Sequence, residues 1–247
     1  MTTSKPKPKQ KEKPLLWIWR RILLTLIPFV VFSAGFIPML GLSYLLYIFI
    51  DWTIWYTLLM VPFIIVILLL ILFLSQLFIS AGFIRLFHIT YKQGTYPYTL
   101  TNKNSFNWIV VCQLYTPMRK LLETIPMGNI RCVYLRLLGM NIGKHCLVGG
   151  VIKDPCCTSF GNNVTMGEYA VLYCHIHDKT AQTLTVKNVV IDDDSVIGAG
   201  AIIMPGVHMQ QQAVVGAGGI VPQGKVLEKN TVYVGSPVQK IQKKEKI

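Results

Sequence analysis

The sequence predicts a two-helix transmembrane hairpin followed by a solenoid of short parallel strands. Two long runs near the N-terminus, 22–50 and 52–84, contain no charged side chain. Further along, apolar residues recur every six positions through twelve units, a period that fits neither an α-helix nor an alternating strand. Between the two blocks of repeats, residues 178–190 break the period.

The two apolar runs are each long enough to cross a bilayer, which takes roughly 20 residues. We expect spans at about 22–48 and 54–84, within a membrane domain of residues 15–86. A cleaved signal peptide is excluded because its apolar core would have only about 7–15 residues. The first span contains Pro28, Gly35, Pro38 and Gly41, and we therefore expect a kink in it.

The net charge of +13 is concentrated beside these spans. Residues 1–21 hold seven basic side chains and one acidic one, Asp51 is the one charge between the runs, and Arg85 and Lys92 follow the second run. Positive residues next to membrane helices stay in the cytoplasm. We expect an integral, multi-pass membrane protein whose N-terminus and following domain are cytoplasmic. We expect no nucleic-acid partner, because no basic motif is interleaved with aromatic residues.

The segments that flank the spans are basic as well. Residues 1–14 and 242–247 are predicted to be basic tails, the first of them disordered. Residues 87–138 form a basic amphipathic connector, with a helix expected at 107–124 whose apolar face includes Trp108, Val111, Tyr115 and Leu122. Its charge suits anionic membrane lipid, although a solvated helix face explains it nearly as well.

The repeats place an apolar residue first in each hexapeptide. These residues are Ile142, Val148, Phe160, Met166 and Leu172 in the first block and Ile191, Ile197, Ile203, Met209, Val215 and Val221 in the second, with Asp154 as the one exception. Three hexapeptides make one coil of 18 residues, so 142–177 and 191–226 are expected to form two coils each. Residues 178–190 are expected to form an extruded loop within a domain of 139–241, and such long loops are usually functional.

Three motifs in these repeats resemble those of the hexapeptide-repeat acyltransferases, including their membrane-anchored members. The motifs are IGAGAIIMPGV at 197–207, VVGAGGIV at 214–221 and the closing GSPVQKI at 235–241. The resemblance covers about 140–241. It implies a left-handed parallel β-helix, a homotrimer, and acetyl-CoA or another acyl-CoA as co-substrate.

The resemblance also implies a general base at the start of the extruded loop. The histidine in the family's position is His177, and His175 is the second choice. An imidazole that is neutral near pH 7 can take the acceptor's proton during acyl transfer. His208 shares the same hexapeptide position, but we expect no role for it. Cys174 is read as a packing residue rather than a nucleophile, as are the other cysteines, because no C-x-x-C pair is present.

For the acyl-CoA, the resemblance implies contacts at Ala199 and Ala217, where small residues let the pantetheine approach the backbone. Simple corner packing explains these alanines equally well. Pro222 and Gln223 depart from the Thr-Lys found in many members of the family. Lys225 and Lys240 are the cations that remain for the CoA phosphates.

The sequence therefore favours a membrane-anchored, CoA-dependent O- or N-acyltransferase that acts at the cytoplasmic membrane face. The tether suggests a membrane lipid as partner, with a lipid-linked sugar or amine as acceptor. The alternative is a catalytically inactive trimeric scaffold in a membrane assembly. A zinc carbonic anhydrase on this fold needs three histidines at a spacing that this chain lacks, so no metal is expected.

Overall fold

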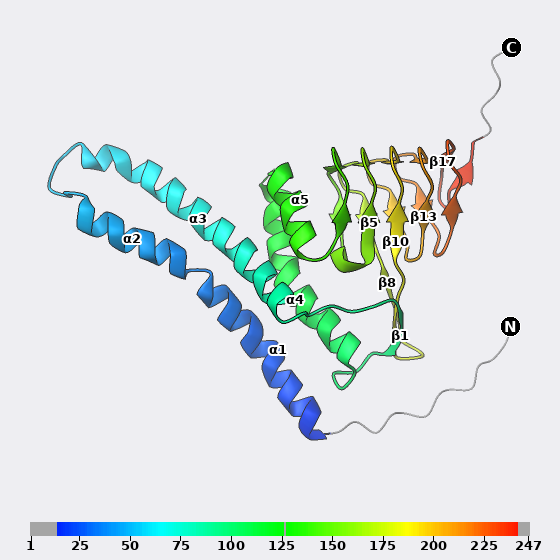
Figure 1. The fold of residues 1–247 in the computed structure, drawn as a ribbon, viewed down its shortest axis with the longest axis horizontal. Helices are drawn as coiled ribbons and strands as arrows, with labels where there is room; N and C mark the ends of the chain where they lie inside the picture. Colours follow the sequence, from blue (N-terminus) through cyan, green and yellow to red (C-terminus); the bar gives the residue numbers. More distant parts are fainter. Residues whose placement is uncertain (1–13, 126, 242–247) are drawn as a thin grey trace, which may run out of the picture.

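The computed structural model describes residues 14–125 and 127–241, with helices in the N-terminal half and short strands in the C-terminal half (Figure 1). The predicted tail 242–247 lies outside the described residues. So does the predicted tail 1–14, apart from Pro14, which begins the first helix.

The first apolar run forms two helices, α1 (Pro14–Ala34) and α2 (Ile37–Phe49), and the second forms α3 (Thr57–Leu86). Figure 1 shows α3 running back alongside α2 and α1. By length and composition, the α1–α2 segment and α3 are each able to cross a membrane. The expected spans fall within these helices except for residues 35–36, between α1 and α2, and residues 54–56, which precede α3.

The predicted kink lies at Gly35 and Phe36, where α1 ends and α2 begins. Side chains of α3 satisfy the carbonyl groups freed there. Ser75 Oγ donates to Gly35 O at 2.6 Å, and Gln76 Nε2 donates to Phe32 O at 2.9 Å. Backbone groups in apolar surroundings need such partners. A Cβ atom at position 35 would lie 2.4 Å from the Gln76 side chain, so glycine fits where α3 approaches.

The connector is folded and comprises β1 (Gly94–Pro97), α4 (Lys103–Thr124) and α5 (Gly128–Leu137). The predicted helix at 107–124 is confirmed. It begins four residues earlier because Asn102 Oδ1 accepts the N–H groups of Asn104 and Ser105. α4 contacts α1 and α3, and its Tyr115 donates a hydrogen bond to Ile152 O in the strand region at 2.7 Å. The connector therefore joins the apolar helices to the strands through packing.

The strands form three parallel sheets that the chain visits in turn. The first sheet contains β2 (Asn141–Ile142), β5 (Thr158–Phe160), β10 (Val189–Ile191), β13 (His208–Met209) and β16 (Val226–Leu227). The second contains β3 (Leu147–Val148), β6 (Thr165–Met166), β11 (Val196–Ile197), β14 (Val214–Val215) and β17 (Val232–Val234), with antiparallel β18 (Gln239–Lys240) at its edge. The third contains β4 (Val151–Ile152), β7 (Val171–Leu172), β12 (Ile202–Ile203) and β15 (Ile220–Val221).

Three successive strands, one from each sheet, make one coil, and the coils stack side by side (Figure 1). The six-residue period of apolar side chains produces buried ladders between coils. In the first sheet, Phe160 pairs with Ile142 on one side and with Ile191 on the other. The period continues past the four expected coils to Leu227 and Tyr233, which begin a fifth.

The first coil departs from the expected register in its third strand. The six-residue period would place residue 154 inward there, but Ile152 fills that position and is 1% exposed. Gly150 shortens the preceding corner, since a Cβ atom on it would lie 2.3 Å from Ala170 O. Asp154 consequently lies after the strand, in the turn that leads into a 3-10 helix, η1 (Pro155–Cys157).

The interruption predicted at 178–190 contains a β-hairpin that begins earlier, at His175, and ends earlier, at Val186, since residues 189–190 already belong to β10. Its strands are β8 (His175–Asp178) and β9 (Thr183–Val186), and β1 of the connector pairs with β9 to complete a three-stranded antiparallel sheet. Figure 1 shows this sheet extending from the coils on the side where α4 begins. Half-buried and buried residues alternate along β9, as expected for a strand with one face against the core.

Candidate active site

Asp154 and His175 form a hydrogen-bonded pair where the chain leaves the third sheet for the hairpin. Nδ1 of His175 lies 2.7 Å from Oδ2 of Asp154. The Asp154 side chain is fully buried, and the His175 side chain is 15% exposed. Because an ionised carboxylate only accepts hydrogen bonds, the neutral imidazole carries its proton on Nδ1. Nε2 of His175 is then unprotonated and able to act as a base.

Three further donors hold the Asp154 carboxylate. Its Oδ1 accepts from Tyr91 Oη at 2.9 Å and Trp108 Nε1 at 3.2 Å, and its Oδ2 accepts from the Cys174 N–H at 2.9 Å. Burial by itself would raise the pKa of Asp154. The hydrogen bond and charge of His175, with the bonds from Cys174 and Tyr91, outweigh burial and lower that pKa. The folded chain therefore holds Asp154 as an anion.

These donors come from separate parts of the chain. Tyr91 follows α3, Trp108 lies in the first half of α4, and Cys174 follows β7. The carboxylate thus lies at the junction of the connector and the first two coils. The connector supplies two of its four hydrogen bonds, so the repeats alone do not build this site.

His177, the residue predicted as base, lies two positions further along β8 and is exposed. Its ring packs edge-on against Tyr98 and Trp108, with centroid separations of 4.7 and 4.9 Å, and lies 5.5 Å from the ring of His175. Partial burial and then the charge of His175 lower the pKa of His177. In the described part of the chain, His177 has no carboxylate partner.

A cavity of about 200 Å³ lies beside His175. α4 contributes Trp108, Thr116 and Arg119 to its wall, and the first two coils contribute Lys153, Tyr173 and His175. His175 and the two cations, Arg119 and Lys153, therefore line the same space. The geometry suits proton removal from a small polar group held in the cavity.

The alanines predicted to contact acyl-CoA share one edge of the coils. Ala199 and Ala217 are both exposed at the corner between the second and third sheets, in successive coils, and Gly218 N donates to Ala199 O at 2.8 Å. His175 lies at a different corner, between the third sheet and the first. A single chain therefore does not bring these alanines and His175 together.

The two predicted cations for CoA phosphates have partners within the chain. Lys225 Nζ donates to Val238 O at 2.7 Å, and Lys240 forms an ion pair with the exposed carboxylate of Glu228. A phosphate would have to compete with these partners for both ammonium groups.

The two remaining residues considered in the sequence, His208 and Cys174, lie at the surface and in the core, respectively. His208 Nε2 lies 2.8 Å from Asp192 Oδ2, and both side chains are about 40% exposed. The Cys174 sulfur is buried 3.3 Å from Thr158 Oγ1, and burial followed by the charge of Asp154 raises the pKa of its thiol. This environment suits a packing residue rather than a nucleophile.

Sequence reasoning did not identify Asp154, Tyr91 or Trp108 as site residues. Asp154 had a detectable signal, because a carboxylate there interrupts an otherwise apolar six-residue pattern. Tyr91 and Trp108 had none, since only the packing of the connector brings them to Asp154.

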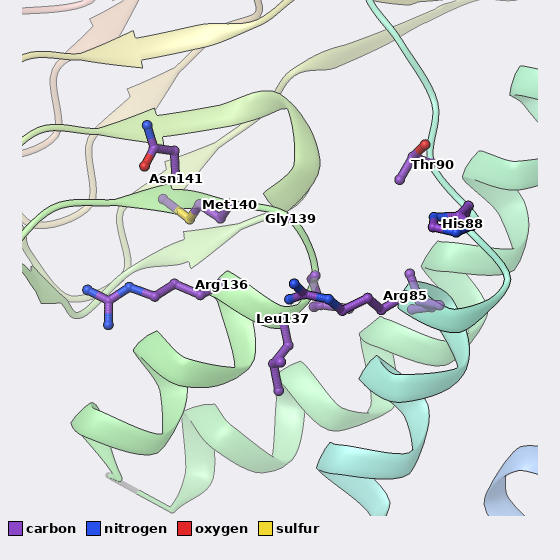
Figure 2. A pocket seen from close by; sticks show the side chains of 10 residues that line it. Arg85, His88, Thr90, Arg136, Leu137, Gly139, Met140 and Asn141 are labelled. Carbon is purple, nitrogen blue, oxygen red and sulfur yellow. The ribbon is translucent and has the colours of Figure 1, made fainter.

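A second cavity, of about 390 Å³, lies where α3 and α5 end (Figure 2). Arg85 and Arg136 belong to its lining, and each lies in the last turn of its helix, where a cation complements the helix dipole. Figure 2 shows the Arg136 side chain extending away from Arg85, and Arg136 Nη2 donates to Ile142 O at 3.1 Å. Stabilisation of the two helix ends therefore explains the positions of both arginines.

No family model matches this chain, and no curated protein sequence is significantly similar to it. Several solved structures resemble it. A hexapeptide-repeat-containing acetyltransferase from Vibrio cholerae is 19% identical, with a TM-score of 0.43 over 55% of this chain and 92% of that one. A maltose O-acetyltransferase from Clostridium difficile is 23% identical, with a TM-score of 0.45 over 56% and 89%. A mutant N-acyltransferase from Bacillus cereus, in complex with an amino-sugar nucleotide and coenzyme A, is 19% identical, with a TM-score of 0.35 over 47% and 90%.

Proposed function

We propose that this protein is a membrane-anchored acyltransferase that moves an acyl group, in the simplest case acetyl, from CoA to a hydroxyl or amine. The observation that carries the proposal is the pair of His175 and the buried Asp154, beside a cavity between α4 and the first two coils. We assign the role of general base to His175 rather than His177, because His175 has the orienting carboxylate.

The proposed reaction is a direct transfer. Nε2 of His175 takes the proton of the acceptor hydroxyl or amine as its oxygen or nitrogen attacks the thioester carbonyl. The new C–O or C–N bond forms, the C–S bond breaks, and the sulfur leaves with the electron pair. The imidazolium of His175 then returns the proton to that sulfur, giving the free thiol. Asp154 stabilises the positive imidazolium through the bond to Nδ1.

For the acyl-CoA, we propose the exposed edge formed by Ala199 and Ala217, whose small side chains leave the corner backbone accessible. That edge lies apart from His175 in one chain. A homotrimer of left-handed β-helices would complete the site by placing the edge of one subunit beside His175 of the next. Lys225 and Lys240 would contribute to phosphate binding only after exchanging their present partners.

We propose that the acceptor is reached at the membrane surface, on the cytoplasmic side. The helix that contributes Trp108 to the site, α4, packs against α1 and α3. Arg20 of α1 donates to Leu100 O, just before α4, at 2.6 Å. The site is thus tied to the predicted membrane anchor, which supports a membrane lipid, or a lipid-linked sugar or amine, as acceptor.

The test is the release of free thiol from acetyl-CoA by full-length protein in detergent, with a total membrane lipid extract as the acceptor source. We expect His175→Ala to lower the rate about 10²–10⁴-fold, the usual contribution of a general base. His208→Ala is the matched control, because it removes a histidine that is also paired with an aspartate but lies on the surface. Its rate should equal that of the wild type.

His177→Ala decides between the two candidate bases. If it abolishes thiol release while His175→Ala retains it, our assignment of the base is wrong. If the wild type neither releases thiol nor binds acetyl-CoA saturably, the enzyme proposal fails and the scaffold alternative remains.

A further inference from the structure

The cavity beside His175 is lined by two cationic side chains that the proposed role of His175 as base does not require. Arg119 and Lys153 both line it, and Arg119 is only 8% exposed. The one carboxylate that pairs with either cation among the described residues is Glu123, which binds Arg119 one helical turn away on α4. Asp154 lies next to Lys153 in sequence, but its oxygens are taken up by His175 and the three other donors.

Lys153 has no ion-pair partner in the part of the chain that the structure describes. Its ammonium lies 5.9 Å from the centre of the Tyr173 ring, and the residue as a whole is half-buried. Burial, and next the charge of Arg119, lower the pKa of Lys153. Both effects disfavour the charged form, and an anion in the cavity would relieve both.

Hydroxyl groups complete the lining. Tyr173 and Thr116 both belong to the wall and carry hydroxyl groups, whereas the hydroxyl of Tyr115, which also lines the cavity, donates to Ile152 O. The cavity thus offers a guanidinium, an ammonium and two hydroxyl donors. Four donors suit the several oxygens of a tetrahedral phosphate better than the two of a planar carboxylate.

The volume limits what enters. At about 200 Å³ the cavity is smaller than the roughly 300–1,000 Å³ of sites that enclose a whole drug-sized ligand. It therefore accommodates the head of a larger molecule, with the remainder outside.

We infer that this cavity binds a phosphate group of the acceptor through Lys153 and Arg119, so that the hydroxyl or amine to be acylated lies a few bonds from that phosphate, beside His175. The identification of the ligand as the acceptor rests on the proposed function, whereas phosphate binding by Lys153 and Arg119 does not. The phosphate belongs either to a membrane lipid head group or to a soluble phosphate monoester.

The first experiment measures phosphate binding without any turnover. Full-length protein is placed in vesicles of a neutral galactolipid, which contains no phosphate, and dialysed to equilibrium against radiolabelled inorganic phosphate. We expect saturable binding that Lys153→Gln weakens about tenfold, the equivalent of one hydrogen bond to a charged group. Lys153→Arg keeps the charge and should bind within a few-fold of the wild type. Lys120→Gln, which removes an exposed lysine of α4, is the matched control and should bind as the wild type does.

A second readout uses the lysine itself. Limited reductive methylation followed by mass spectrometry reports the reaction rate of each lysine. Inorganic phosphate should slow the methylation of Lys153 and leave that of Lys120 unchanged. Acetate at the same concentration should give little protection. If acetate protects equally well, or if Lys153→Gln binds phosphate as tightly as Lys120→Gln, the inference is wrong.

Competition then identifies the source of the phosphate. Displacement of inorganic phosphate by phosphatidylglycerol in the vesicle assigns a lipid head group, whereas displacement by glycerol 3-phosphate alone assigns a soluble acceptor. If phosphate binding depends on Lys153 but no acceptor supports thiol release, the phosphate site is confirmed and the proposed function is wrong. Thiol release without Lys153-dependent phosphate binding would do the reverse.

Discussion

Nδ1 of His175 lies 2.7 Å from Oδ2 of Asp154, although Asp154 follows the last strand of the first coil and His175 begins the hairpin that follows the second. In a regular repeat, position 154 would point into the core. The corner at Gly150 is shortened, Ile152 takes the core position instead, and Asp154 falls in the turn that faces the start of the hairpin. The irregularity in the repeat is therefore what brings the carboxylate to the histidine.

Asp154→Asn should lower the rate of thiol release by about 10² or more, because an amide no longer fixes the tautomer of His175 or stabilises its protonated form. The apparent KM for acetyl-CoA should change little, since Asp154 is fully buried behind His175. Steady-state kinetics with acetyl-CoA measures both quantities. Asp192→Asn disrupts the exposed pair with His208 and should behave as the wild type. Equal losses in both variants would show that the Asp154 pair has no special role.

The stability of the fold should depend on the charge of Asp154 in acid. The folded chain lowers the pKa of this carboxyl, so ionised Asp154 stabilises the fold fully above the unfolded-state value of about 4. That stabilisation is lost as the pH falls through the lower folded-state pKa. The difference in Tm between the wild type and Asp154→Asn should therefore be largest near neutral pH and shrink below about pH 4. Thermal unfolding in detergent from pH 7 to pH 3 measures it, and a difference that grows on acidification would contradict the assignment.

Much of the architecture follows from local pattern. The apolar runs predicted α1 to α3, and the six-residue period predicted which strands pair in parallel, because both signals repeat along the chain and need no long-range information. The hairpin was predicted only as an interruption at 178–190. Its sheet is completed by β1, about ninety residues earlier in the chain, which pairs with β9, and no local pattern reveals that partner.

The candidate site was less accessible to sequence reasoning for the same reason. His175 and His177 stand out by their place beside the interruption, but the two are nearly equivalent in the sequence. What distinguishes them is a buried carboxylate held by Tyr91 and Trp108, which approach from the connector. The roles predicted for His177, Ala199, Ala217, Lys225 and Lys240 remain predictions.

Tyr91→Phe should lower the free energy of unfolding by about 1.5–3 kcal/mol, the range for a hydrogen bond to a charged group. Tyr91 is 3% exposed, and its hydroxyl donates to Asp154 at 2.9 Å, so water cannot replace the lost donor. Urea unfolding of the full-length protein in detergent, followed by circular dichroism of the strands, provides the measurement. Tyr98→Phe is the control, because Tyr98 is 44% exposed, and its change should stay within about 0.5 kcal/mol. A loss for Tyr91→Phe no larger than for Tyr98→Phe would mean that the bond to Asp154 contributes little.

Two glycines separate the effect of the shortened corner from the general cost of replacing a corner glycine. Gly218 adopts φ +66°, and a Cβ atom on it would meet nothing within 4 Å. Asn163 and Asn230 adopt the same left-handed conformation, with φ of 56° and 54°, so Gly218→Asn should leave the Tm nearly unchanged.

Gly150→Ala should behave differently. Its Cβ atom would lie 2.3 Å from the backbone oxygen of Ala170, which cannot turn aside as a side chain would, so β4 must shift. Overpacking of this kind costs about 1–3 kcal/mol, and Tm should fall accordingly. Because Asp154 lies two residues after β4, the same shift moves its carboxylate relative to His175. Thiol release should then fall more than the stability loss alone explains, when Gly150→Ala and the wild type are both assayed well below their Tm. A folded Gly150→Ala protein with the wild-type rate would show that the shortened corner does not position Asp154.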